Sequence, residues 1–442
     1  MTNELIFEDV FDKKLDIEFS KSDMSSDSGL ILFKPILKKL NLVSKISDIL
    51  HDPRHPLYIT HSHQELVEQR IAMMIAGYND LNDNDFLRKD PAFKLFTKGA
   101  NSSLDLASTP TIFRLDNVVT ISECKKMVEL QVALYLERNQ KRFNEEMKKN
   151  SFLTISLNLD PTDVTTYGEQ QLALFNGYYG DKCFLPMVIT DGANGDLICG
   201  FLRPGTKHAC WCLESILRRL FNRIEEKYEK VHYHVRADSG FQKESFFSFL
   251  ERKANLTYEI ALASNSSLKK MTKGCCYTGA EIIFEEDNVL KTYNEFGYKA
   301  DSWTHFRRVV IKIEINRHGV DVRFIATNGT SSPLKTLESY HQRCNIENRI
   351  KELKNHAGGS RLSASEFSSN FFRFSLACFV VICFEEFKKK LTGIKFENCY
   401  ISTIREKFIK VAGIIKISLR RVLLELSRNH PSNEYWGKIL ST

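Results

Sequence analysis

Apolar residues recur every three or four positions through the first third of the chain. Residues 63–78 show this most clearly, with apolar side chains at Leu66, Val67, Ile71, Met74 and Ile75. That period places them on one face of a helix. Pro110 suits the first position of another helix, and residues 122–149 form a long amphipathic segment. The pattern predicts a helical domain over residues 29–150, preceded by a polar, flexible lead-in of residues 1–28.

At Phe152 the period changes to two. Residues 152–160 alternate apolar and polar side chains and end in Asp160, which is typical of a strand. Residues 191–195 (Asp-Gly-Ala-Asn-Gly) have the composition of a hairpin turn. Further strands are predicted at residues 182–190, 197–202, 231–237 and 258–263, and helices at residues 210–230 and 242–253. The resulting order β-β-β-α-β-α-β is the element order of the ribonuclease H-like fold.

Strand signals continue beyond residue 264. Apolar and β-branched residues are frequent at 281–285, 307–315 and 320–327. We therefore expect an α/β protein with a ribonuclease H-like core interrupted by a β-strand insertion and flanked by N-terminal and C-terminal all-helical regions. The predicted boundaries are 151–263 for the first part of the core, 264–330 for the insertion, 331–390 for the remainder of the core and 391–442 for the C-terminal helical region.

The composition is that of a soluble globular protein. Hydrophobic residues make up 43% of the chain and charged residues 26%. The length of 442 residues suits two to four structural units. No apolar run is expected to span a bilayer, and the longest, at residues 376–384, is predicted to be a buried helix. The N-terminus lacks the basic and apolar segments of a secretory signal, so we expect a cytoplasmic location and no membrane partner.

The cysteines do not indicate a metal site. Eleven of them are scattered without a Cys-x-x-Cys pair. Their closest groupings, Cys210 with Cys212 and Cys275 with Cys276, have no second half at zinc-finger spacing. We interpret them as reduced side chains that pack in the interior.

Basic residues concentrate towards the C-terminus. From His341 onward there are 18 lysines and arginines against 9 aspartates and glutamates, whereas the whole chain carries a net charge of +7. A basic third of a chain indicates a polyanionic partner, and nucleic acid is the commonest one. A basic helix on a membrane surface is the alternative, but no single predicted helix concentrates the charge enough to favour it.

Four residues of the predicted helix after residue 331 have side chains suited to phosphate chemistry. Tyr340, Arg343, Glu347 and Lys354 stand at positions i, i+3, i+7 and i+14. At about 100° per residue they would fall within an arc of roughly 60° on one helix face. One carboxylate beside three phosphate-binding groups suits an enzyme that holds a metal ion against a nucleic-acid backbone. The alternative is an ordinary solvated helix face with ion pairs.

Two further carboxylates end predicted strands. Asp160 and Asp238 follow the first and fourth strands, and strand ends of an open α/β sheet face one crevice, where Glu347 would join them. Mutual repulsion among three carboxylates is relieved by cations, and hard oxygen ligands suit two Mg²⁺ or Mn²⁺ ions. Each acid also has a structural alternative, as a turn residue or an ion-pair partner, and Asp163 is a rival for Asp160.

These residues resemble those of bacterial insertion-sequence transposases of the DDE class, in particular the insertion-sequence-1380 family. The Tyr-x2-Arg-x3-Glu-x6-Lys signature is matched without departure from Tyr340 to Lys354. Residues 159–163 (Leu-Asp-Pro-Thr-Asp) and 236–241 (Arg-Ala-Asp-Ser-Gly-Phe) resemble the blocks around the first and second aspartates. The similarity covers nearly the whole chain, and Pro161 departs from the small residue usual at its position.

The resemblance implies a magnesium-dependent DNA transposase with Asp160, Asp238 and Glu347 as its catalytic metal ligands. Such an enzyme binds the terminal inverted repeats of a mobile insertion sequence, cleaves DNA by metal-dependent hydrolysis and joins the 3′-hydroxyl ends to target DNA. Related transposases pass through a DNA hairpin. Double-stranded DNA as partner, a homodimer in a synaptic complex and a bacterial, nucleoid-associated location follow from the resemblance. Residues 29–150 and 391–442 would supply DNA binding, and the latter dimerisation.

The resemblance also suggests which side chains touch DNA. Tyr340, Arg343 and Lys354 would contact phosphates of the transposon end. The further predicted contacts are Arg349, Lys351, Trp303, Arg307, Arg420 and Arg421. Trp303 would stack on an extruded base, with packing in the interior as its structural alternative.

Two other functions remain open from the sequence. The first is a DNA-binding protein derived from a transposase that has lost catalysis, which the intact set of three carboxylates disfavours. The second is a nuclease of the ribonuclease H fold that never joins strands. The β insertion and the four-residue signature disfavour it, because a simple nuclease needs neither.

Overall fold

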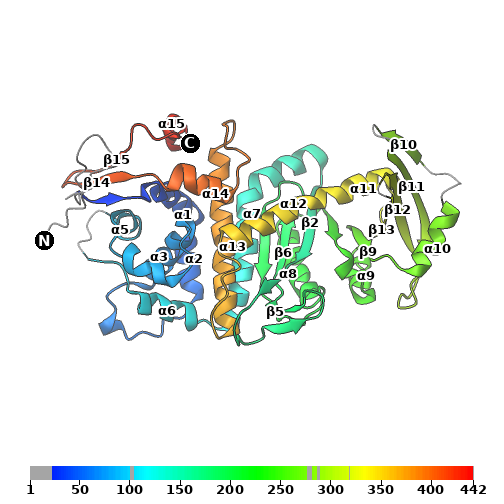
Figure 1. The fold of residues 1–442 in the computed structure, drawn as a ribbon, viewed down its shortest axis with the longest axis horizontal. Helices are drawn as coiled ribbons and strands as arrows, with labels where there is room; N and C mark the ends of the chain where they lie inside the picture. Colours follow the sequence, from blue (N-terminus) through cyan, green and yellow to red (C-terminus); the bar gives the residue numbers. More distant parts are fainter. Residues whose placement is uncertain (1–21, 100–103, 276–280, 286–288, 318, 442) are drawn as a thin grey trace, which may run out of the picture. The chain divides into compact units, whose positions relative to one another are not determined.

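The chain forms two compact units. The computed structural model describes residues 22–99, 104–275, 281–285, 289–317 and 319–441 (Figure 1). Most of the predicted lead-in and Cys276 lie outside these residues. The first unit combines residues up to Ser47 with Asp52–Leu115 and the chain from Glu386 onward, and the second combines Asp48–His51 with Asp116–Glu385.

Short helices make up most of the first unit, as the apolar period predicts. α3 begins in a capping box, in which the Ser62 and Glu65 side chains each accept a hydrogen bond from the other residue's backbone N–H. The α-helices that lie wholly or mostly in this unit are α1 (Lys34–Leu40), α2 (Leu42–Ile49), α3 (His63–Ala76), α4 (Asn84–Leu87), α5 (Pro91–Lys98), α6 (Thr109–Asn117), α14 (Ile401–Ile404) and α15 (Asn433–Ser441).

The N-terminal and C-terminal segments fold together in this unit. The Ser28 N–H donates to the Val411 carbonyl at 3.1 Å, and a Cβ on Gly29 would lie 1.6 Å from the Phe408 carbonyl oxygen. Only glycine permits that approach. The Arg405 guanidinium donates to two carbonyls at the C-terminal end of α3, and burial lowers its pKa to about 10. Residues after 391 therefore complete the N-terminal helical unit.

The C-terminal region is not all-helical, which corrects the prediction. β14 (Gly413–Ile417) and β15 (Val422–Leu426) form an antiparallel hairpin, and β1 (Met24–Ser25) pairs with β14 at its other edge. The physical reason is the β-branched run in 414–417 and Val422, which favours extended backbone. The end of the predicted lead-in is likewise structured, because β1 falls within it.

A nine-stranded sheet forms the centre of the second unit. Its strand order is β10-β11-β12-β13-β9-β8-β2-β6-β7. β2 is parallel to β8 and β8 to β9, whereas all other neighbours are antiparallel. The strands are β2 (Leu153–Pro161), β6 (Met187–Asp191), β7 (Leu197–Phe201), β8 (Val231–Ala237), β9 (Leu256–Leu262), β10 (Glu281–Glu285), β11 (Val289–Tyr298), β12 (Arg307–Asn316) and β13 (Gly319–Thr327).

The predicted insertion extends this sheet. β13 pairs with β9, so the strands after residue 264 continue the sheet. β11 was missed by the sequence pattern, which predicted the other three strands there, and α10 (Ser266–Cys275) precedes them.

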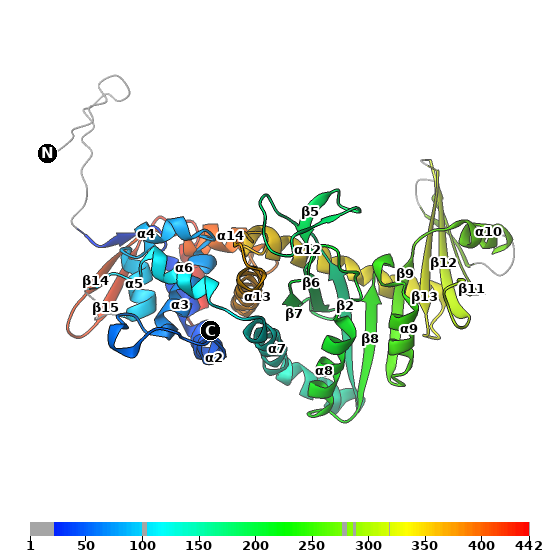
Figure 2. The same ribbon diagram turned by 90° about the horizontal axis from the view of Figure 1, so that it is seen from below.

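One predicted strand is in fact two strands in different sheets. Residues 182–190 divide into β5 (Asp181–Phe184) and β6, because Pro186 between them has no N–H to donate. β5 lies in a separate small sheet of order β3-β5-β4, with β3 at Val164–Thr165 and β4 at Leu174–Asn176. Figure 2 shows this small sheet standing out from the large one.

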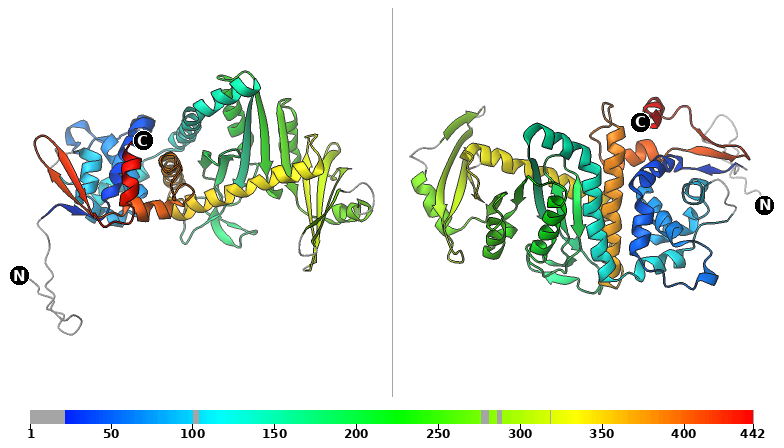
Figure 3. Two further views of the ribbon diagram at one scale, coloured as in Figure 1. Left: turned by 90° about the horizontal axis from the view of Figure 1, so that it is seen from above. Right: turned by 180° about the vertical axis from the view of Figure 1, so that it is seen from behind.

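Two long helices lie side by side in the second unit (Figures 1 and 3). α7 (Ile121–Asn150) confirms the amphipathic segment predicted at 122–149, and it packs against β7 and β2. Arg138 of α7 pairs with Glu385 of α13 (Phe367–Lys390) at 2.7 Å. The other α-helices of this unit are α8 (Leu213–Glu225), α9 (Glu244–Glu251), α11 (Pro333–His341) and α12 (Asn345–Lys351).

α13 is the helix predicted around residues 376–384. By length and composition it could cross a membrane, with a mean hydropathy of 1.7 in its apolar window, contrary to the expectation that no run is long enough. The structure buries 94% of that window. A helix whose apolar window is buried on nearly all sides is typical of the core of a large folded unit.

Candidate active site

Asp160 and Asp238 end neighbouring parallel strands. β2 and β8 are in register from Leu153 with Val231 to Leu159 with Ala237, so the next residue of each strand is an aspartate at the same sheet edge. Asp160 is buried, with 9% of its surface exposed. The Asp238 carboxylate accepts a hydrogen bond from the Gly240 N–H at 2.9 Å, which orients it at the strand end.

Arg343 joins the two aspartates. Its Nη2 atom donates to Asp160 Oδ1 at 2.8 Å and lies 4.0 Å from Asp238 Oδ2. Arg343 lies in a 3₁₀ turn, Gln342–Cys344, between α11 and α12. The part of the signature segment that carries Arg343 therefore lies against the ends of β2 and β8. The two aspartates lie at one sheet edge, where the sequence analysis places them.

The signature segment is not one regular helix, which corrects the predicted arc. The 3₁₀ turn winds more tightly than an α-helix, and a π-helical turn at Glu352–His356 winds more loosely. Consequently Lys354 has different partners from Arg343. Its Nζ atom lies 3.2 Å from Asp163 Oδ1 and 3.3 Å from Thr162 Oγ1. Asp163, the rival for Asp160, is thus the partner of Lys354.

Electrostatics tie Glu347 to the same site. The pKa of Asp160 is raised to about 7, chiefly by burial; the carboxylates of Asp238 and Glu347 add to the rise, and Arg343 opposes it. Burial alone would lower the pKa of Arg343, but Asp160, Tyr340 and the other two carboxylates raise it. Glu347 itself is exposed on α12. The site is an anionic cluster in which Asp160 is buried, Asp238 is partly exposed and Arg343 supplies the positive charge.

Tyr340 lies partly buried at the edge of this pocket. It packs on a small apolar cluster that includes Val310, Ile325 and Leu337. Burial raises the pKa of its phenol, and Asp238 and Asp160 add to that effect. A cleft of about 300 Å³ adjoins it, lined by signature residues Tyr340, Arg343 and Glu347 and by residues of β9 and β13.

The donor set suits a hard divalent cation, but the side chains do not form a closed metal cage. Throughout the described residues, no three His, Cys, Asp or Glu side chains converge closely enough to hold a metal ion. Asp160 and Asp238 instead direct oxygens at Arg343. Carboxylate oxygens are the ligands Mg²⁺ and Mn²⁺ prefer, and the raised pKa of Asp160 shows that the pocket favours a compensating positive charge.

Arg349 and Lys351, two predicted DNA contacts on the signature segment, differ in exposure, because Arg349 is partly buried and Lys351 is exposed. Arg349 Nη1 pairs with Glu352 at 2.7 Å, and its Nε donates to the Gly195 carbonyl at 3.0 Å. The bond to Gly195 fastens α12 to the β6–β7 hairpin, whereas the pair with Glu352 lies within the signature segment. Lys351 is exposed on the same helix.

Trp303 and Arg307 have structural partners. The Trp303 ring is 5% exposed and packs edge-on against Phe247. Arg307 lies beneath it, paired with Glu244 at 2.8 Å and Glu251 at 2.7 Å. Trp303 therefore matches its packing alternative, and Arg307 is held in buried ion pairs, so neither belongs to the proposed DNA interface.

Arg420 and Arg421 lie in the first unit. Both are exposed in the turn between β14 and β15, where the Ser418 N–H donates to the Arg421 carbonyl. Unlike the buried Arg307, both side chains are accessible to solvent.

The sequence analysis missed a positioning residue. Arg236 is 5% exposed, and its Nη2 donates to Ser339 at 3.2 Å and to Gln342 at 3.1 Å. Glu259 on β9 lies 3.6 Å from its Nε. Arg236 thus ties β8 to the segment that carries Arg343. An arginine two residues before Asp238, near the end of a predicted strand, was the signal that could have identified it.

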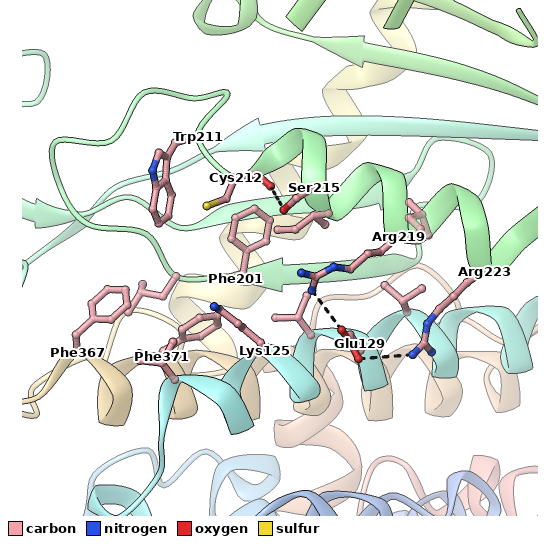
Figure 4. A pocket seen from close by; sticks show the side chains of 16 residues that line it. Lys125, Glu129, Phe201, Trp211, Cys212, Ser215, Arg219, Arg223, Phe367 and Phe371 are labelled. Carbon is pink, nitrogen blue, oxygen red and sulfur yellow. Dashed lines mark hydrogen bonds and ion pairs between the residues drawn. The ribbon is translucent and has the colours of Figure 1, made fainter. Parts of the chain in front are cut away.

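A separate apolar pocket of about 200 Å³ lies between α7, α8, β7 and α13 (Figure 4). Trp211 and Phe371 contribute to its walls, and Glu129 pairs with Arg219 and Arg223 along one side. None of the three carboxylates or the four signature residues lines it.

Comparison with known families defines the class of protein. Residues 7–442 match the family model described as Transposase DDE domain group 1, and the chain belongs to this family. It is therefore a transposase, of a class of DNA-cleaving and DNA-joining enzymes that generally use divalent metal ions.

Among solved structures, the chain is similar to a piggyBac transposase determined by cryo-electron microscopy as a synaptic complex with hairpin DNA. The two share 10% sequence identity, with 88% of this chain and 83% of that chain covered and a TM-score of 0.42. No curated protein matches the chain.

Proposed function

We propose that this transposase resembles the insertion-sequence-1380 enzymes and moves an insertion sequence by cut-and-paste transposition. It would bind terminal inverted repeats, hydrolyse DNA at each end and join the 3′-hydroxyls to target DNA. The observation that carries the proposal is the meeting of Asp160, Asp238 and Arg343 at one sheet edge.

The strand order supports a ribonuclease H-like core. Among the five strands β9-β8-β2-β6-β7, the first in the chain, β2, is central. β8 and β9 run parallel to it on one side, whereas on the other side β6 is antiparallel to β2 and β7 is antiparallel to β6. This arrangement brings the ends of β2 and β8 to one crevice. The β insertion then adds strands beyond β9.

Asp160, Asp238 and Glu347 would hold two Mg²⁺ or Mn²⁺ ions. Such ions supply an activated water or 3′-hydroxyl and stabilise the oxygens of an in-line phosphoryl transfer. When DNA binds, the Arg343 guanidinium would move its hydrogen bonds from the Asp160 carboxylate to a phosphate, because its planar fork matches both groups. Lys354 and Tyr340 would contact neighbouring phosphates. The Lys354 ammonium lies 3.2 Å from Asp163, three residues beyond Asp160 in the chain.

Other features of the cycle are proposed from the family resemblance. A homodimer would pair the two transposon ends, and the second strand at each end would be cut through a hairpin. Lys351, Arg420 and Arg421 are exposed and remain proposed phosphate contacts. Charge of this kind contributes binding without sequence preference.

The test uses the DNA that borders the gene as substrate for the full chain. Asp160→Ala, Asp238→Ala and Glu347→Ala should each abolish strand cleavage in Mg²⁺ and leave DNA binding in a gel shift largely intact. Asp163→Asn is the matched control and should retain cleavage. If an Asp160 variant still cuts DNA while Asp163→Asn does not, the metal-ligand assignment is wrong. A wild-type chain that binds this DNA without cutting it would favour the non-catalytic alternative.

A further inference from the structure

Aromatic side chains are concentrated at one end of the small β3-β5-β4 sheet. Tyr167 is 95% exposed, Tyr178 88% and Tyr179 37%. Exposure of three tyrosines at one end of a small sheet is unusual, since aromatic rings are normally buried or half-buried. None of them has a role in the proposed chemistry so far.

Strand register brings the three residues to the same end of the sheet. Asn176 of β4 is opposite Asp181 of β5, so Tyr178 and Tyr179 lie in the turn that joins these strands. On the other side of β5, the Thr166 N–H donates to the Lys182 carbonyl at 3.0 Å. Tyr167 is the next residue and therefore reaches the same turn.

The turn holds the tyrosine pair in a defined orientation. The Asn176 side-chain oxygen accepts from the N–H groups of Tyr178 at 3.0 Å and Tyr179 at 3.4 Å. Gly180 closes the turn at a φ of 73°, a left-handed conformation that favours glycine. The two rings meet edge to face with centroids 4.9 Å apart. Rings held in place in this way lose little conformational entropy when a ligand binds.

The base of the small sheet is fixed as well. The Asn176 amide donates to the Gly205 carbonyl at 2.8 Å. A Cβ on Gly205 would lie 2.1 Å from the Cys183 carbonyl oxygen, so this backbone approach requires glycine. The Gln171 side-chain oxygen accepts from the Phe367 N–H at 3.0 Å, which ties the sheet to the start of α13.

The tyrosine turn adjoins the carboxylates of the proposed site. Burial raises the pKa of Tyr179 to about 12, and Asp163, Asp160 and Asp238 all contribute to the rise. The chain geometry agrees, because β3 of the small sheet begins at Val164, directly after Asp163, whose carboxylate pairs with Lys354 at 3.2 Å. The small sheet that carries the tyrosines therefore starts beside the site.

We infer that Tyr167, Tyr178 and Tyr179 form a stacking surface for unpaired DNA bases next to the phosphate that lies at Asp160 and Asp238. This inference rests on the proposed function and adds a binding site to it. Every base has a π-face, so stacking on tyrosine holds a strand without reading its sequence. Duplex DNA hides these faces, so the surface would select ends at which bases are unpaired or extruded.

The experiment compares two DNA probes on the full-length protein. One is a short duplex with two unpaired thymines, and the other is the same duplex fully paired. Tyr178→Ala and Tyr179→Ala should each weaken binding of the bulged duplex roughly tenfold and change binding of the paired duplex less than about twofold. Tyr178→Phe should bind like the wild type, because stacking needs the ring and not the hydroxyl. Phe306→Ala, which removes a ring that is 70% exposed and has no role in the proposed DNA interface, is the matched control.

A second readout reports stacking directly. With 2-aminopurine in place of an unpaired base, wild-type protein should quench its fluorescence, and the alanine variants should not. Equal loss for both duplexes, or no loss for either, would overturn the inference. So would a change in oligomeric state on Tyr178→Ala without any change in bulge binding, since the tyrosines would then contact a second copy of the chain. Cleavage of the bordering DNA by the wild type is scored separately, so a failed stacking surface can be told apart from a failed transposase assignment.

Discussion

Arg343 donates a hydrogen bond to Asp160 across 2.8 Å, although 183 residues separate the two in the chain. The contact connects the first acid of the site to the signature segment. It also explains how a carboxylate that is 9% exposed is tolerated beside two others. A buried charge is stable only when a partner compensates it.

The pKa of Asp160 predicts a pH-dependent stability. Its folded-state pKa of about 7 lies above the ordinary value of 3.8, so the folded protein binds a proton that the unfolded chain releases. Between about pH 4 and pH 7, stability should therefore fall as pH rises. Asp160→Asn removes this penalty. We compare the melting temperature of Asp160→Asn with that of the wild type in the absence of divalent metal. The difference, variant minus wild type, should be about 2–4 °C more positive at pH 8 than at pH 5.

The change between the two pH values is the informative quantity, because Asn also weakens the bond to Arg343 at every pH. Asp163→Asn serves as control and should show no comparable change. A difference between Asp160→Asn and the wild type that is the same at pH 5 and pH 8 would contradict the raised pKa.

Divalent metal should stabilise the folded chain. Binding of Mg²⁺ or Mn²⁺ to the folded state alone raises the melting temperature in proportion to the logarithm of metal concentration above Kd. We expect this rise for the wild type and for Asp163→Asn, and its loss in Asp160→Asn and Asp238→Asn. Calorimetric melting with and without metal measures it. A wild-type rise that persists in Asp160→Asn would place the metal elsewhere.

Arg343→Lys tests the guanidinium fork. Lysine keeps the positive charge near Asp160 but is a point charge and cannot form two parallel bonds to a phosphate. Cleavage should fall about tenfold or more, whereas gel-shift affinity should stay within about twofold. Equal loss of binding and cleavage would instead make Arg343 a general contributor to DNA affinity.

Arg307 should prove structural. Its side chain is 2% exposed between Glu244 and Glu251. Burial alone would raise the pKa of Glu244. Hydrogen bonds, of which the one from Arg307 has the largest effect, lower it to about 2. Arg307→Ala leaves two carboxylates without their partner and should cost about 3–5 kcal/mol of unfolding free energy in urea denaturation.

The neighbouring Arg308→Ala is the control and should cost less, because Arg308 pairs with the half-exposed Glu295. The salt dependence of DNA binding separates the two possible roles of Arg307. A direct phosphate contact would lower the slope of log K against log salt by about one unit on mutation. We expect the slope for Arg307→Ala to match that of the wild type.

Local pattern was sufficient for most elements of the second unit. The alternation that ends in Asp160 predicted β2 to within a residue, and β8 was predicted at its observed bounds. Periodicity works there because each strand is buried or half-buried along its length. It failed at residues 182–190, where one apolar run contributes strands to two sheets. It also failed at β14 and β15, short strands that pair with each other and, for β14, with β1 at the other end of the chain.

The sequence alone determined which residues are suited to metal and phosphate binding. These are two acids that end strands and the spaced Tyr, Arg, Glu and Lys of the signature. Identity and spacing are local properties, so a linear reading finds them. Only tertiary structure decided their partners, with Arg343 on Asp160, Lys354 on Asp163, and Arg307 and Trp303 turned into the interior. It also decided that the C-terminal segment completes the N-terminal helical unit. The physical reason is that burial and ion pairing depend on residues far apart in the chain, which no local period encodes.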